Sequence, residues 1–404
     1  MQKTKIIAGI EIGTGKVSVL LGEIIEGKSL NIIGMGQCSS KGVVKGDIVD
    51  FHEANDCTHA AILAAENQAG VKIDGVYLAM SGTHIEGFAS EASVNVTGAD
   101  GMVTRGDLLQ VCDVAQSREL PENRTVIHHL RRPYRLDGRC LNTPVGMEGE
   151  KLEVSYWTSH GDARKISDAI HIINGFNLHV DDIILSALAS SSTVTTPEER
   201  KSGVLVIDLG RGTTDYALYN EGRCMIAGAL PIGGDHISND LSIGLRVRLK
   251  QAESLKLRFG SAVNESKDKS EKVWLNNDLE IGDRPVPLWS IEKIVELRAT
   301  ETFEVVKKRL GKLYSNDKLG AGIVLCGGGS NLPNVDRCAA KVFGTQARIG
   351  DNRSMASGEL RDGQFSTPLG LLHYGLRYQG SRDVVNNEQG SGLFGKLKGL
   401  FQKG

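Results

Sequence analysis

The sequence has no apolar run long enough to cross a bilayer, little net charge, and no C-x-x-C cysteine pair. The apolar stretch at residues 6–10 is short and is interrupted by Glu11, so no secretory signal is expected. A net charge of −2 over 404 residues argues against a protein that binds nucleic acid through its phosphates. The seven cysteines are dispersed, which favours neither a zinc site nor a disulfide framework. We therefore expect a cytosolic protein that contacts membranes only peripherally.

The length of the chain predicts more than one folded unit. At 404 residues it is too long for one ordinary hydrophobic core, and two lobes of usual domain size are expected. The apolar fraction of 40% and the charged fraction of 24% are typical of a soluble globular protein.

Two short loops rich in glycine and threonine each follow a β-branched run that ends in a carboxylate. They are Glu11 to Lys16 and Asp208 to Asp215. Such a loop brings backbone N–H groups and a metal-positioning oxygen up to a phosphate, although a single one would equally suit a tight hairpin. After each loop come a strand, a turn and another strand. This repeated unit predicts two related lobes.

Changes in composition and in the pattern of apolar residues divide the rest of the chain. We expect the following parts: a first lobe core at 1–83 and 161–196, an α+β insert at 84–160, a second lobe core at 197–243 and 305–378, a mostly helical second insertion at 244–304, a flexible linker at 379–391 and an amphipathic helix at 392–404.

A nucleoside triphosphate is the ligand expected between two such loops. Threonine hydroxyls and Lys16 would add donors, and Glu11 and Asp208 would approach Mg²⁺ through water, unless these acids only cap strand ends. A third glycine loop leaves room for a ring or ribose. Glu253 and Lys256 share a helix face, from which they either reach the nucleoside or form a solvated ion pair. The expected nucleotide contacts are Gly13, Thr14, Gly15, Lys16, Gly210, Arg211, Gly212, Thr213, Thr214, Gly234, Glu253, Lys256, Gly327, Gly328 and Gly329.

The last residues have the pattern of a helix that lies in a membrane surface. At 100° per residue, five apolar side chains fall on one arc with lysines at its edges. The alternative is a terminal helix that docks on its own protein, but the polar linker and the lysines favour anionic lipid. Such a short helix would bind weakly alone, and polymerised copies would gain avidity. The expected membrane residues are Leu393, Phe394, Lys396, Leu397, Lys398, Leu400 and Phe401.

These motifs resemble those of the actin-like ATPase superfamily, and within it the FtsA family of bacterial cell-division proteins. Segments that carry the resemblance are 9–17, 78–82, 142–147, 187–191, 322–328 and 366–372, spread over the whole chain. The resemblance implies an α/β, actin-like, two-lobed fold with duplicated ribonuclease-H-like cores, an FtsA-type insert at 84–160 and a C-terminal membrane-targeting helix. It also implies ATP and Mg²⁺ as ligands.

The resemblance further implies a partner set. The protein would polymerise on the inner face of the cytoplasmic membrane, tether the FtsZ ring and bind other divisome proteins through the insert. The FtsZ C-terminal peptide would dock near Arg298, Glu301 and Phe303, which otherwise form an ordinary solvated helix face. Two other functions remain open at this point: a pilus-assembly scaffold similar to PilM, and a small-molecule kinase of the same superfamily.

Two departures from the family pattern bear on nucleotide chemistry. Arg211 stands where the second loop usually has a third glycine, so it either contacts a phosphate or points to solvent. The stretch at 185–189, near the first-lobe hinge, has no Gln or Glu to orient an attacking water. We therefore expect nucleotide binding with weak or negligible ATPase activity.

Overall fold

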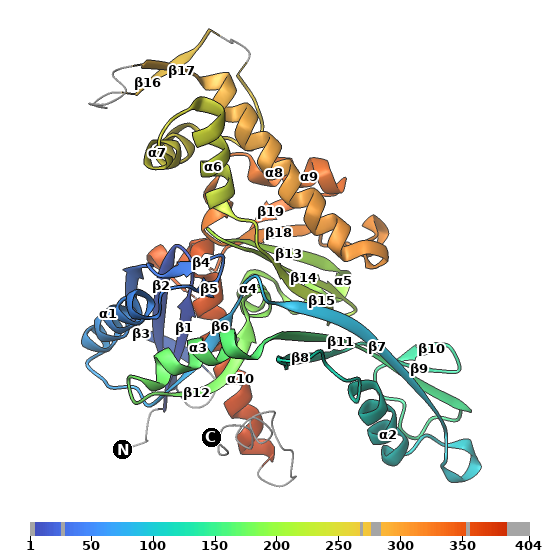
Figure 1. Ribbon diagram of the computed structural model, residues 1–404. Coiled ribbons are helices and arrows are strands. Elements are labelled where there is room, and N and C mark those ends of the chain that lie inside the picture. Colours follow the sequence, from blue (N-terminus) through green and yellow to red (C-terminus); the bar gives the residue numbers. More distant parts are fainter. Residues whose placement is uncertain (1–4, 26–28, 267–269, 276–283, 353–355, 386–404) are drawn as a thin grey trace.

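A computed structural model describes residues 5–25, 29–266, 270–275, 284–352 and 356–385 of the chain. Figure 1 shows two lobes packed against each other, with an elongated insert projecting from the first lobe. Within the described ranges, every helix is too short or too polar to span a bilayer.

Each lobe is built on a five-stranded sheet with the same topology. In both, three consecutive antiparallel strands are followed by two parallel ones, in the order third, second, first, fourth, fifth. This confirms the duplication predicted from the two loops. The first sheet is β3 (Ser29–Ser39), β2 (Lys16–Ile25), β1 (Lys5–Ile12), β6 (Gly75–Met80) and β12 (His179–Leu185); the second is β15 (Arg223–Leu230), β14 (Thr214–Asn220), β13 (Val204–Leu209), β18 (Ile323–Cys326) and β19 (Ala347–Ile349).

Apolar runs place the central strands inside the molecule. The residues of β13 from Val204 to Ile207 have no exposed surface, because helices cover both faces of its sheet. On the first lobe, α1 begins after Asp50, whose carboxylate accepts from the Glu53 N–H at 3.1 Å, and ends at Gly70 in the left-handed conformation. The helices and short elements around the sheets are α1 (Phe51–Ala69), α3 (Ala163–Asn174), α4 (Ser186–Val194), α5 (Pro197–Ser202), α9 (Val335–Phe343), β4 (Val43–Val44), β5 (Asp47–Ile48), η2 (Gly311–Leu313), η3 (Asn316–Lys318), η4 (Gly328–Asn331), η5 (Gly358–Arg361) and η6 (Gly363–Phe365).

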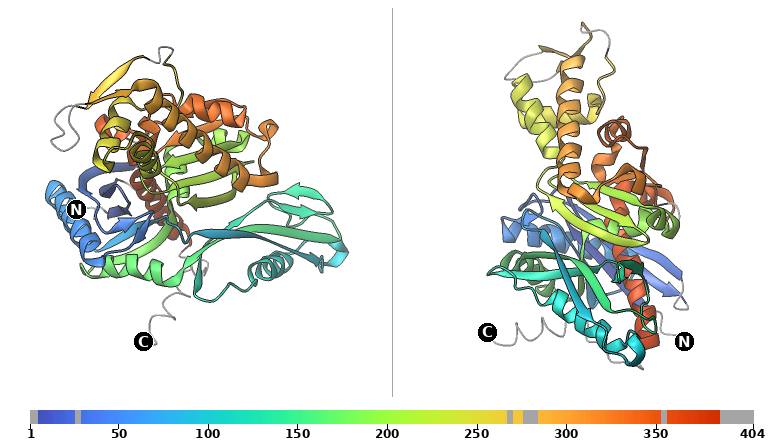
Figure 2. Two further views of the ribbon diagram at one scale, coloured as in Figure 1. Left: turned by 45° about the horizontal axis from the view of Figure 1, so that its top comes forward. Right: turned by 90° about the vertical axis from the view of Figure 1, so that its right-hand side faces the viewer.

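The insert of the first lobe is a separate sheet with one helix. Its strand order is β10, β9, β11, β7, and β8 also pairs with β11. Figure 2 shows it reaching outward as an arm. Its core is formed by apolar residues that include Val111, Leu136 and Leu152. The elements are β7 (Glu86–Asn95), η1 (Ala99–Gly101), α2 (Arg105–Gln116), β8 (Arg124–Arg131), β9 (Tyr134–Leu136), β10 (Arg139–Leu141) and β11 (Lys151–Asp162).

The second insertion shares a helix with the second lobe. It consists of α6 (Gly234–Leu245), α7 (Leu249–Phe259), the hairpin β16 (Lys272–Leu275) and β17 (Arg284–Pro287), and the first part of α8 (Leu288–Leu310). The predicted boundary at 243/244 therefore falls inside α6, and the one at 304/305 falls inside α8. The C-terminal half of α8 packs into the second-lobe core through Val306 and Leu310, so no domain boundary exists there.

The last described helix, α10 (Ser366–Val385), corrects two boundaries. Residues 366–378 were expected in the second lobe, but α10 lies against the first-lobe sheet (Figure 1), where Leu369 and Leu372 pack with Ile7 and Leu20. Residues 379–385 were expected in a flexible linker and instead continue this helix. The rest of the predicted linker and the whole predicted membrane helix lie outside the described residues.

Candidate functional site

A cavity of about 290 Å³ lies in the cleft where the two glycine loops face each other. Most of the predicted contacts line it, and so do several residues that the sequence did not single out. The predicted lining residues are Glu11, Gly13, Thr14, Gly15, Lys16, Asp208, Gly210, Arg211, Gly212, Thr213, Gly327 and Gly328.

The first loop is a closed turn held against the rest of its lobe. The Gly13 N–H donates to the carbonyl of Lys16 at 3.1 Å, and the hydroxyl of Thr14 accepts from the Gly46 N–H at 2.9 Å. The Lys16 ammonium donates to the amide oxygen of Gln364 at 2.8 Å and lies 4.4 Å from the centre of the Phe365 ring. Burial lowers the pKa of Lys16.

The second loop forms the same closed turn, but its basic side chain has a different partner. The Gly210 N–H donates to the carbonyl of Thr213 at 2.9 Å. Arg211, whose role the sequence left open, is half exposed and pairs with Asp235 at the start of α6, with Nε 2.7 Å from Oδ1. The Asp235 carboxylate therefore holds the guanidinium, even though Arg211 also borders the cavity.

Five predicted nucleotide contacts do not line the cavity. Thr214 is fully buried and its hydroxyl donates to the carbonyl of Ile232 at 2.7 Å, so a nucleotide cannot reach it and this prediction was wrong. The other four are Gly329, Gly234, Glu253 and Lys256.

The last three of these form a small cluster beside the second loop. The Lys256 ammonium lies 2.7 Å from Glu253 Oε2 and donates to the carbonyl of Gly234 at 3.1 Å. Its side chain is mostly buried, so the pair is not the freely solvated one that the sequence allowed. Whether a nucleoside reaches this cluster stays a prediction.

Three acidic side chains line the cleft, namely Glu11, Asp208 and Asp215. Burial and the nearby Asp208 raise the pKa of Glu11 to about 8, and the same two causes raise the pKa of Asp215 to about 8. Burial also raises the pKa of Asp208, whose Oδ2 accepts from the Thr367 hydroxyl at 2.9 Å. Acids that are this costly to ionise suit a site that receives a cation.

The donor set fits a hydrated Mg²⁺ better than an ion held wholly by protein. In the described part of the chain, no three acidic, histidine or cysteine side chains are close enough to hold a metal together. Mg²⁺ keeps several waters and typically takes one or two carboxylates plus phosphate oxygens. Glu11 and Asp208 can supply those carboxylates from opposite lobes.

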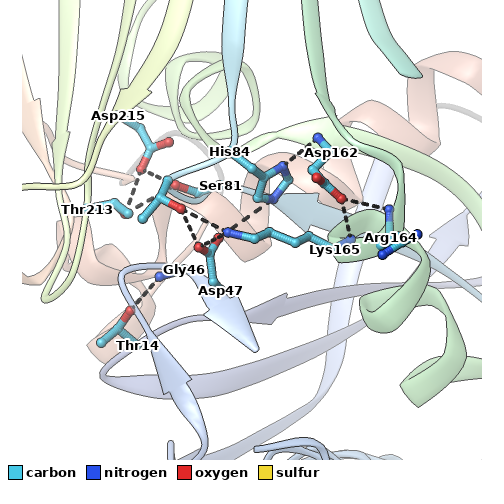
Figure 3. A network of polar contacts seen from close by, with 11 residues as sticks. Thr14, Gly46, Asp47, Ser81, His84, Asp162, Arg164, Lys165, Thr213 and Asp215 are labelled. Atoms are coloured by element: carbon cyan, nitrogen blue, oxygen red, sulfur yellow. Dashed lines mark hydrogen bonds and ion pairs between the residues drawn. The ribbon is translucent and has the colours of Figure 1, made fainter. Parts of the chain in front are cut away.

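Sequence reasoning missed the residues that join the lobes next to the loops. The Ser81 hydroxyl, at the end of β6, donates to Asp215 Oδ2 at 2.9 Å and lies 3.1 Å from the Thr213 hydroxyl (Figure 3). Because β6 is parallel to β1, its C-terminal end reaches the same edge of the sheet as Glu11, and this was the available signal. The other missed lining residues include Gly46, Ser186, Gly363, Gln364 and Thr367.

Of the three residues predicted to bind a partner peptide, Arg298 and Glu301 share a face of α8 and Phe303 does not. Arg298 pairs with Asp240, with Nη2 3.1 Å from Oδ1, and with Glu301 at 2.6 Å. Phe303 is 1% exposed and packs edge-on against Phe343 in the second-lobe core. Phe303 follows Glu301 by two residues, so its side chain points about 200° away from that of Glu301 around α8. It is therefore not available for docking. Its assignment was wrong.

Comparison with known families matches two segments of the chain. The family described as "Cell division protein FtsA" matches residues 205–370, and the one described as "SHS2 domain inserted in FTSA" matches residues 82–157. The cell division protein FtsA of Pseudomonas aeruginosa is 32% identical over 385 residues, covering 94% of this chain and 91% of the relative. FtsA of Escherichia coli strain K12 is 33% identical over 386 residues, covering 92% and 90%.

Solved structures share the architecture at low identity. The PilM–PilN type IV pilus biogenesis complex aligns with a TM-score of 0.63 and 14% identity, over 92% of this chain and 98% of that one. MreB5 of Spiroplasma citri bound to ADP aligns with a TM-score of 0.56 and 15% identity, over 96% and 99%. The likeness confirms the actin-like two-lobed fold. The relatives more than 30% identical over nearly the whole length show that the chain belongs to the FtsA family of cell division proteins.

Proposed function

We propose that the chain binds ATP with Mg²⁺ in the cleft between its lobes. The observation that carries this proposal is the pair of equivalent acid-glycine loops, one from each duplicated hairpin, that face each other across a single cavity. Backbone N–H groups of Gly13 to Lys16 and Gly210 to Thr213 would hold the phosphates from both sides. Glu11 and Asp208 would hold a hydrated Mg²⁺, which neutralises phosphate charge.

The cleft favours binding over rapid hydrolysis. Ser186 is the residue of the hinge stretch that lines the cavity, and a hydroxyl is a weaker base than a carboxylate. Gln364 enters the cleft from another element, but its amide oxygen accepts from Lys16. We therefore expect the nucleotide to act mainly as a structural or switching ligand.

At the level of the cell, the chain would polymerise beneath the cytoplasmic membrane and tether the FtsZ ring to it. Membership of the FtsA family supports this role, and so does the amphipathic pattern at 392–404. The FtsZ C-terminal peptide would dock on the exposed face of α8 that carries Arg298 and Glu301. The insert would bind other division proteins.

Nucleotide binding is tested by equilibrium dialysis with labelled ATP, with and without Mg²⁺. Asp208→Asn should weaken Mg²⁺-dependent binding about tenfold or more, because one buried carboxylate is lost from the cation site. Glu359→Gln, at an exposed acid of η5 that does not line the cavity, is the matched control. Wild-type protein that retains no ATP in either condition would overturn the proposal.

The tether is tested by co-sedimentation with anionic liposomes. The full chain should pellet, and a chain ending at Gln389 should stay in the supernatant. Equal pelleting of both would remove the main support for a tether and would favour a scaffold similar to PilM. Electron microscopy on lipid monolayers with ATP, with and without an FtsZ tail peptide, then tests filament formation and partner binding.

A further inference from the structure

The insert contacts the second lobe along the free edge of strand β15. This strand ends the second-lobe sheet, so the carbonyls on its outer side pair with no strand of that sheet. Two insert side chains bind them: the Trp157 indole N–H donates to the carbonyl of Ala227 at 2.9 Å, and Arg132 Nη2 donates to the carbonyl of Met225 at 3.0 Å. Side chains, not a ladder of backbone hydrogen bonds, cover this edge.

The contact combines a few hydrogen bonds with apolar packing. The Trp157 ring packs against the second-lobe core, in space left by Gly87 on the neighbouring strand β7, where an added Cβ would lie 2.6 Å from the indole. A third hydrogen bond joins Arg223 Nε to the amide oxygen of Asn142 at 3.0 Å. Beside these contacts lies a hollow of about 590 Å³, bordered by Glu91 and Pro133 of the insert and by Lys318 of the second lobe. Separating this junction would break three side-chain hydrogen bonds and withdraw the Trp157 ring from the second-lobe core.

The base of the insert lies at the phosphate loops. Strand β7 begins at Glu86, five residues after Ser81, which bonds to Asp215 of the other lobe. At the other end, Asp162 closes β11 and its N–H donates to His84 Nδ1 at 3.2 Å (Figure 3). Both ends of the insert are therefore tied into the polar network of the cleft.

That network reaches the first phosphate loop through Asp47. The Asp47 carboxylate lies 2.5 Å from the Lys165 ammonium of α3 (Figure 3). It also accepts a hydrogen bond from the Thr83 hydroxyl. The preceding residue, Gly46, donates its N–H to Thr14. A movement of the first phosphate loop would therefore displace residues that are bonded directly to the ends of the insert.

We propose that the insert is a latch between the lobes whose engagement with β15 depends on the nucleotide. This inference rests on the proposed ATP site. Because the insert is rooted in the first lobe but bonded to the second, movement of one lobe against the other must bend the insert or break these contacts. A hydrogen bond of 2.9 Å is lost beyond about 3.5 Å, so a relative shift well below 1 Å is enough. The insert then presents its outer surface differently in the two nucleotide states.

Linkage fixes the direction of the effect. If ATP tightens the latch, a weakened latch must lower ATP affinity, and if ATP loosens it, a weakened latch must raise that affinity. The sign of one measurement therefore predicts the sign of the other.

The experiment compares the full chain with Trp157→Phe, which keeps most of the ring volume and removes the N–H donor. Hydrogen exchange of the peptide 223–230 reports the latch, and dialysis with labelled ATP reports affinity. Without nucleotide, Trp157→Phe should speed exchange in this peptide about fivefold, the value of one hydrogen bond. Trp274→Phe, at an exposed tryptophan on β16, should change neither quantity. Arg132→Lys provides a second, milder variant if the first is unstable.

The outcomes separate the latch from the nucleotide site. The proposal predicts that ATP changes exchange at 223–230 at least about threefold in the wild type, and that Trp157→Phe shifts ATP affinity in the linked direction. Normal ATP binding with unchanged exchange in this peptide would overturn the latch and leave the proposed function intact. No ATP binding by dialysis would overturn the proposed function, and the latch with it.

Discussion

The two phosphate loops come from the same duplicated hairpin but are stabilised by different parts of the chain. The first loop places Lys16 against Gln364 and Phe365, just before the final helix. The second places Arg211 against Asp235, at the start of α6 in the second insertion. The side chain of each loop therefore contacts a different neighbouring element, although the backbone turns are alike. The duplicated turns set where the phosphates would lie, and the flanking elements set which other segments would move when phosphates bind.

The largest expected difference between the loops is steric. Gly212→Ala should weaken ATP binding about thirtyfold or more, because its Cβ would overlap the Thr14 hydroxyl and lie 2.8 Å from Lys45 Cα. In the first loop, Gly15→Ala would meet only the Arg211 side chain at 3.3 Å, which can move, so affinity should change less than about threefold. Equilibrium dialysis measures both variants. Equal losses would show that the loops tolerate crowding alike.

The acid of the first loop should control stability at neutral and alkaline pH. The pKa of Glu11 is raised to about 8 in the folded state, above its unfolded value, so its contribution is fully present below about pH 4.5 and is lost as pH rises toward 8. Glu11→Gln removes this loss and should stabilise the nucleotide-free protein by about 2 kcal/mol at pH 8, with little effect at pH 4.5.

Urea unfolding at the two pH values measures this difference. Glu23→Gln, further along the same hairpin, serves as the control and should show no comparable change between pH 4.5 and pH 8. A Glu11→Gln protein whose stability relative to wild type is the same at both pH values would contradict the expectation.

The number of protons released on ligand binding gives a second test of the raised pKa values of the acids in the two loops. At pH 7 the carboxyls of Glu11 and Asp215, each with its pKa raised to about 8, are mostly protonated. Mg²⁺ favours their ionised forms, so binding of Mg·ATP should release about one proton at pH 7 and almost none at pH 9. Calorimetry in buffers of different ionisation enthalpy counts the protons. Binding enthalpies that do not depend on the buffer at pH 7 would be the contrary result.

The smallest effect is expected at the cation of the second loop. Arg211 is half exposed and paired with Asp235, so Arg211→Ala should lower ATP affinity less than about threefold. Asp235→Ala frees the guanidinium and should raise affinity slightly if the side chain then reaches a phosphate. A tenfold loss in Arg211→Ala would instead place the guanidinium on the nucleotide.

The sequence was most informative where the chemistry is local. A buried β-branched run, an acid and a glycine turn are contiguous, so both loops and the repeated hairpins could be predicted, and the fold with them. Thr214 and Phe303 were misassigned because each points away from its neighbours: strand residues alternate between faces, and a helix turns 100° per residue. Attention to these periods would have excluded both.

Other features depend on which elements meet in space. Ser81 and Gln364 enter the cleft from segments far from the loops in sequence, and their side chains carry no distinctive pattern. The placement of α10 could not be predicted from the sequence either, because its apolar residues could pack against the sheet of either lobe. Only the packing partners Ile7 and Leu20 decide between them.

The position of α10 also has a consequence for how the protein is made. Leu369 and Leu372 complete the core beneath β1 and β2, the first strands to leave the ribosome. That side of the first sheet must remain uncovered while the insert and the entire second lobe are synthesised. The lobe that begins the chain is therefore the last to be finished, and a nascent chain interrupted before residue 366 would present an open apolar face to chaperones.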